Sequence, residues 1–254
     1  MRLMFPEARF PMTLSLRHFL LLGAAALTAG CFQSETKVVT PEMGVQLEGV
    51  SAGVYCHADT SQIDDKAQIA LPSALTTAPK VSESMGENKC RDLSWSADIS
   101  AYVDARSKGT VFRPYPMLPE LDLLQFESSA GMRAYYLPLA AVDGLILAYD
   151  GQSKWPADKL AAAGVAKPEG DVLTGATEEQ VMNVLKAMWP DILAEIRADI
   201  SFTNQADKGP RLAIERFREG HYIFYAREDW MSDPAKMEAA MRALAAKLGL
   251  KSEG

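Results

Sequence analysis

The sequence predicts an α+β fold, with an antiparallel sheet or partial barrel in the N-terminal half and a helix–hairpin–helix arrangement in the C-terminal half. A change of apolar pattern along the chain leads to this prediction. From Val45 to about Asp150, short apolar runs alternate with turn residues, which is typical of antiparallel strands. After Asp150, apolar residues recur every three or four positions, which is typical of amphipathic helices.

Strands are expected at several places in the N-terminal half. The stretch 46–59 is strand-like around Val54 and Tyr55, and further strands are expected within 67–71, 90–103, 110–118, 121–128 and 132–150. The dipeptide Asp143-Gly144 separates two apolar runs, which is the strongest local signal for a β-hairpin. Pro114 and Pro116 indicate an edge strand or a bend, because proline cannot donate to a sheet ladder.

Helix signals follow. A short helix is expected between Pro156 and Gly164, since proline suits a helix start and glycine a helix end. The sequence 177–180, "TEEQ", is a capping box. The apolar stripe after it keeps its register through Pro190, so we expect one kinked helix or two nearly collinear ones.

The last part of the chain predicts a hairpin between helices. The run 211–229 reads as two strands that turn at Glu219-Gly220. A final helix is expected over 232–249, with a Ser/Asp cap, Pro234 in its first turn and Gly249 at its end. We expect the hairpin to pair within a sheet that the helices cover on one face.

The N-terminus has the order of a secretory signal. Arg2, Arg9 and Arg17 precede the uncharged run 19–30, "FLLLGAAALTAG", and small residues lead to Cys31. Twelve residues are too few for a membrane span, which needs about 20. Met12 offers a cleaner start than Met1, because the first eleven residues contain two prolines and a glutamate.

The sequence "LTAGC", residues 27–31, resembles the lipobox of bacterial lipoproteins, and the resemblance covers residues 12–32. It implies that the Cys31 thiol receives a diacylglycerol and that the new amine is acylated, so the bilayer is the first expected partner. Thr28 departs from the leucine usual three residues before the cysteine. Phe32 stands where an aspartate would imply inner-membrane retention, so we expect a lipid-anchored outer-membrane protein on the periplasmic face. The alternative is a soluble periplasmic product.

This resemblance divides the chain into a signal peptide over 1–30, a polar tether over 31–44 and a globular domain over 45–254. An alternative is that this domain consists of two subdomains, one mostly-β over 45–150 and one α+β over 151–254. The chain after residue 30 carries 23 basic and 32 acidic residues. Nucleic-acid binding needs a basic footprint, so this balance argues against it.

Two cysteines besides Cys31 remain, and in an oxidising compartment they predict a Cys56–Cys90 disulfide that encloses 33 residues. Unpaired thiols are the main alternative. The cysteines lack the spacing of a CxxC pair, and neither His57 nor His221 completes a zinc-ligand pattern, so we expect no metal and no cofactor.

No catalytic motif is visible, and both histidines read more readily as surface or rim residues than as bases. The acidic pair at 178–179 is explained by a helix start, where negative charge is favoured, whereas the pairs at 64–65 and 228–229 are more typical of solvated turns than of glycosidase carboxylates. The aromatic residues 222–230 fit either a ligand groove or a strand buried on both faces. We therefore expect a binding, assembly or structural role, with an envelope protein as a further candidate partner. The alternative is a periplasmic hydrolase whose site is assembled from distant residues.

Overall fold

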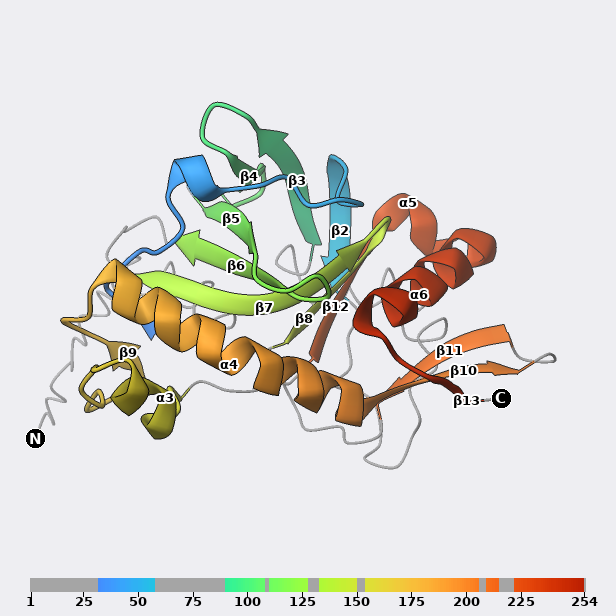
Figure 1. Cartoon of the computed structure of the whole chain (residues 1–254). Helices are drawn as coiled ribbons and strands as arrows, with labels where there is room; N and C mark the ends of the chain where they lie inside the picture. The colour runs from blue at the N-terminus through green and yellow to red at the C-terminus, as the bar shows by residue number, and fades with distance from the viewer. Residues whose placement is uncertain are drawn as a thin grey trace, which may run out of the picture.

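The computed structural model describes residues 32–57, 90–107, 110–127, 133–149, 154–205, 209–214 and 222–253. Its centre is a closed barrel of eight antiparallel strands (Figure 1). The strands are β2 (Gly53–His57), β3 (Cys90–Ser96), β4 (Ala101–Asp104), β5 (Val111–Pro116), β6 (Asp122–Glu127), β7 (Ala134–Val142), β8 (Leu145–Tyr149) and β12 (Tyr222–Arg227). The order around the barrel is β6-β5-β4-β3-β2-β12-β8-β7, and pairing of β7 with β6 completes it.

The expected fold class was wrong in two respects. The sheet is a closed barrel and not a partial one, and the C-terminal half is not a helix–hairpin–helix unit. The expected hairpin divides between two sheets: β12 pairs with β2 and β8 inside the barrel, whereas β11 (Gly209–Ile214) pairs with β10 (Ile200–Gln205) outside it. The short β13 (Ser252–Glu253) adds to β10 in parallel.

The reason lies in the two faces of β12, which are both apolar. Tyr222 and Phe224 point outward under the helices, whereas Ile223 and Tyr225 point into the barrel. A strand with two apolar faces is stabilised by cover on both sides, and the position between β2 and β8 provides this cover. The expected turn at Glu219-Gly220 lies outside the described residues.

The prolines lie where a barrel strand pairs with a neighbour on one side and lacks a partner on the other. Strand β4 pairs with β5 only at Val111 and Phe112, so Pro114 and Pro116 lie beyond this ladder. On β7, Pro138 lies between the residues that pair with β1 and those that pair with β8. The prolines therefore mark local gaps in the ladders and not the edge of an open sheet.

The helices that the sequence predicted begin and end close to the indicated residues, whereas α5 (Glu228–Met231) was not predicted. Helix α4 (Glu178–Asp199) is a single helix that contains Pro190, and the capping box of Thr177 and Gln180 is present. Helix α6 (Pro234–Leu248) has Asp233 as its N-cap and Gly249 in the left-handed conformation after its end. Helix α3 (Ala157–Ala162) precedes Gly164, and α5 (Glu228–Met231) follows β12 directly. The β7–β8 hairpin turns at Asp143-Gly144, as expected.

Residues 32–44, which we expected to be a polar tether, are part of the folded body. Strand β1 (Phe32–Ser34) pairs with β7 and with β9 (Val172–Leu173), and Phe32 is 1% exposed. The indole N–H of Trp155 donates to the Gln33 carbonyl. After β1 the chain follows the outside of β6 to the 3-10 helix η1 (Pro41–Met43). The apolar pair Val38-Val39 gave the missed signal, since both residues are buried.

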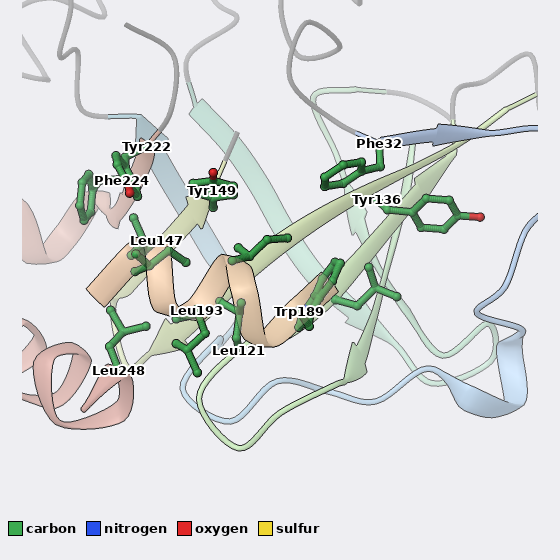
Figure 2. Close-up of a cluster of buried hydrophobic side chains, with 14 of the residues drawn as sticks. Phe32, Leu121, Tyr136, Leu147, Tyr149, Trp189, Leu193, Tyr222, Phe224 and Leu248 are labelled. Atoms are coloured by element: carbon green, nitrogen blue, oxygen red, sulfur yellow. The ribbon is translucent and has the colours of Figure 1, made fainter. Parts of the chain in front are cut away.

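Two apolar clusters hold the fold together. The larger one lies between the outer face of the barrel and the helices, where Trp189 and Leu193 of α4 face Leu147 and Leu121 (Figure 2). The second cluster fills the barrel interior. Each fully buried large side chain contributes about 1.5–3 kcal/mol, so the outer cluster fixes α4 and α6 on the barrel.

Candidate ligand-binding site

The barrel interior is the candidate site, because its side chains leave an unfilled cavity of about 90 Å³. Alternate residues of each strand point inward, and an eight-stranded barrel is just wide enough to be filled or to hold one small ligand. Of the fifteen lining side chains, eleven are hydrocarbon, three are tyrosines and one is an arginine. Six of the hydrocarbon side chains are Leu93, Phe112, Leu124, Leu137, Ile146 and Ile223.

One end of the barrel is covered by the chain segment 44–52. Leu47 and Val50 from this segment are buried and line the cavity. The Tyr102 hydroxyl donates to the Val50 carbonyl at 2.9 Å, which holds the segment over the barrel. Gly49 has a positive φ of 84°, and a Cβ there would lie 2.5 Å from the Asp143 amide nitrogen. Only glycine fits this close contact between segment 44–52 and the β7–β8 turn, so Gly49 allows the segment to cover the barrel end.

The hydroxyl groups of two lining tyrosines donate hydrogen bonds to the covering segment. Tyr55 donates to the Ser51 carbonyl at 3.2 Å, as Tyr102 does to Val50. Burial raises the pKa of Tyr102 to about 12 and also raises the pKa of Tyr55. Both side chains therefore stay neutral at physiological pH and present ring carbons to the cavity.

An ion pair marks the opposite end of the barrel. Arg91 lines the cavity and its Nη1 donates to Asp104 Oδ2 at 3.2 Å. The side chain of Asp104 is fully buried and also accepts the backbone N–H groups of Asp92 and Arg106, each at 3.0 Å. The Asp104 carboxylate therefore accepts three hydrogen bonds, whereas Arg91 uses only one of its five N–H groups to bind this carboxylate.

The predicted disulfide is confirmed. Cys56 and Cys90 are directly opposed on β2 and β3 and are bonded. Their neighbours in sequence, Tyr55 and Arg91, line the cavity and are themselves opposed. The disulfide therefore fixes the two strands beside the Arg91 end of the site. Cys31 lies outside the described residues, so its lipidation stays a prediction.

The aromatic residues near the C-terminus do not form a surface groove. Tyr222 and Phe224 are 2% and 1% exposed beneath the outer cluster, and the Tyr222 hydroxyl donates to Asp199 of α4 at 2.9 Å. Trp230 is half-buried against Gly144, where a Cβ would lie 2.2 Å from the ring. Tyr225, in contrast, lines the cavity. The outward face of the strand is buried under the helices, and its partly buried inward face borders the candidate site.

Of the histidines and acidic pairs considered in the sequence, those that the structure describes do not line the cavity. His57 points into the barrel, with its ring 5.6 Å from that of Tyr225, but does not line the cavity. His221 and the pair 64–65 lie outside the described residues. The pair 178–179 occupies the first turn of α4, as expected, whereas the pair 228–229, expected as turn residues, begins α5.

Hydrolysis and metal binding each need particular types of side chain grouped together. Among the described residues, those that line the cavity include no serine, no histidine and no carboxylate. In the same ranges, no three His, Cys, Asp or Glu side chains are grouped closely enough to hold a metal ion. Within the part of the chain that is described, no helix is both long and apolar enough to cross a membrane.

Comparisons with family models, curated proteins and solved structures gave no match. The interpretation of the site therefore rests on its geometry and chemistry.

Proposed function

We propose that this protein is a bacterial envelope lipoprotein, anchored through Cys31, whose barrel binds a small molecule in its interior. The observation that carries the binding role is the cavity of about 90 Å³ with an almost entirely apolar wall. Cores are usually packed with few voids larger than a water molecule, so an apolar space of this size inside the barrel supports a binding role. The hydrolase alternative has no comparable support, because the described lining offers no nucleophile or base.

The position of β1 supports a short connection between anchor and barrel. Phe32 follows Cys31 in the sequence and is buried in the sheet beside β7. Acyl chains on Cys31 would therefore be attached one residue before the folded body. Several acyl chains on one residue give stable attachment. On this proposal the barrel lies close to the membrane surface of the periplasmic side of the outer membrane.

The anchor is tested with the full chain in a bacterial host that processes lipoproteins. Cys31→Ser is expected to abolish labelling by radioactive palmitate and to release the protein from the membrane fraction. A conservative change at the neighbouring Thr28→Ser is the matched control and should retain both properties. Unchanged membrane retention of Cys31→Ser would overturn the anchor.

The binding role is tested on wild-type protein purified from membranes under mild conditions. Native mass spectrometry should detect a bound small molecule in addition to the acyl chains, and denaturation should release it. The Cys31→Ser protein is a control for lipid carried by the anchor, because it retains the barrel. An empty barrel in both proteins, together with no binding of any added small molecule, would contradict the proposed function.

A further inference from the structure

We infer that the cavity takes an uncharged molecule with one small apolar ring or branched alkyl group and a single hydrogen-bond acceptor that faces Arg91. This inference rests on the proposed binding function and names the chemical class of its ligand. Three features of the described site carry it: the size of the cavity, the composition of its wall, and the state of the Arg91–Asp104 pair.

The size of the cavity limits the apolar group to about one ring. An apolar protein cavity of about 150 Å³ holds one benzene molecule. The space here, about 90 Å³, is smaller. Leu93, Phe112 and Leu124 are only half-buried although they line it, so they have room to adjust around a single ring. A fused pair of rings exceeds the space that such adjustment provides.

The wall of the cavity requires an apolar and uncharged group. Nearly all of the lining is carbon, and the hydroxyls of Tyr55 and Tyr102 are already bonded to backbone carbonyls. A charged group placed among these side chains would lose its hydration without a compensating partner. The ligand therefore enters as a neutral molecule.

Arg91 provides the specific polar contact. It is the one charged side chain among the lining residues, and it is 17% exposed. Its single ion-pair partner among the described residues is Asp104, through one N–H group. The remaining N–H groups can meet an acceptor at the edge of the cavity. Because Asp104 already neutralises the guanidinium, a second carboxylate would be repelled, and a neutral carbonyl or ether oxygen fits better.

The polar contact is tested with three probes that share a six-membered carbon ring. Cyclohexanone carries an acceptor, methylenecyclohexane replaces the oxygen by carbon, and cyclohexanecarboxylate is an anion. NMR titration of the Leu, Ile and Val methyl groups should give about tenfold tighter binding for the ketone than for the hydrocarbon, as expected for one hydrogen bond to a charged donor. The carboxylate should bind more weakly than either.

The variant Arg91→Met removes the donor and should make the affinities for the ketone and the hydrocarbon equal. Asp104 keeps the N–H groups of Asp92 and Arg106 in this variant, so its carboxylate is not left without partners. An unchanged preference for the ketone in Arg91→Met would overturn the role of Arg91.

The location and size of the site are tested by filling and by enlarging the cavity. Ala148 is buried on the inner face of β8, so Ala148→Phe should fill the space and abolish cyclohexanone binding. Ile99→Phe changes an exposed residue and is the matched control. Leu124→Ala should admit 1-decalone, a two-ring ketone that the wild-type protein excludes. This second variant removes atoms, so it remains informative if the filled barrel fails to fold.

The outcomes separate the ligand class from the proposed function. Tighter binding of the carboxylate than of the ketone, lost in Ala148→Phe, would overturn the neutral ligand class and leave the binding role standing. Binding of 1-decalone by the wild-type protein would overturn the size limit alone. If none of the probes binds and no occupant is released from protein purified from membranes, both the class and the binding role fail.

Discussion

Gln125 provides the sharpest test of how the N-terminal segment is held on the barrel. Its side chain is fully buried on the outer face of β6. Its Oε1 accepts the N–H groups of Val38 and Val39 at 2.8 Å each, and its Nε2 donates to the Val39 carbonyl at 3.1 Å. One amide side chain thus satisfies three backbone groups that have no sheet partner.

The substitution Gln125→Leu keeps the approximate size of the side chain and removes these three hydrogen bonds, together with a longer one of 3.4 Å from Nε2 to Glu127 Oε1. Each contributes about 1 kcal/mol, and each backbone group left buried without a partner adds to the cost, so the free energy of unfolding should fall by about 3–5 kcal/mol. Urea unfolding of the chain from residue 31 onward measures this loss. The exposed Gln46→Leu is the matched control and should change stability by less than about 0.5 kcal/mol.

Amide hydrogen exchange distinguishes global destabilisation from local detachment. If residues 35–40 leave the barrel in Gln125→Leu, water solvates their backbone groups and the loss of global stability becomes smaller. The amides of Val38 and Val39 should then exchange fast, whereas those of β7 stay protected. A variant with wild-type stability and unchanged protection at Val38 and Val39 would refute the reasoning.

Three further predictions concern stability. Tyr222→Phe leaves the buried Asp199 carboxylate without its hydroxyl donor, and thermal unfolding should show a loss of about 2 kcal/mol. The pKa of Glu127 would be raised by burial, but two neighbouring cations overcome this and hold it below its ordinary 4.5. Its stabilising effect is therefore complete above about pH 4.5 and is lost as the pH falls below it, and Glu127→Gln should flatten the acid side of the stability profile. Replacing Cys56 and Cys90 together by serine should cost about 3–4 kcal/mol, and the reductant sensitivity of the wild-type midpoint should disappear in the variant.

The sequence predicted local structure well and the global pairing poorly. Helix ends depend on neighbouring residues, so Thr177, Gln180, Pro234 and Gly249 marked them correctly. The Asp143-Gly144 turn is local in the same way. The closure of the barrel depends on pairing between residues far apart, such as Tyr225 with His57 and Ile146, and no local pattern specifies those partners.

The candidate site escaped prediction for a related reason. Its lining residues come from all eight strands and from the covering segment, and each alone reads as an ordinary core residue. Only the Cys56–Cys90 pair was visible, because cysteine count and compartment restrict it strongly. The one further signal was the apolar run 222–226, in which both faces of the strand are hydrophobic. It indicated two buried faces but not that one of them borders a cavity.

The central claim is that the barrel interior binds a small neutral molecule, and methyl nuclear Overhauser contacts test it most directly. In protein labelled at the Leu, Ile and Val methyl groups and saturated with cyclohexanone, we predict contacts from the probe to Leu124, Leu137 and Ile223, which line the cavity. Leu147, which faces outward from β8, should show none. Contacts confined to exposed residues such as Val45 and Ile99, or none at all at saturation, would contradict the account.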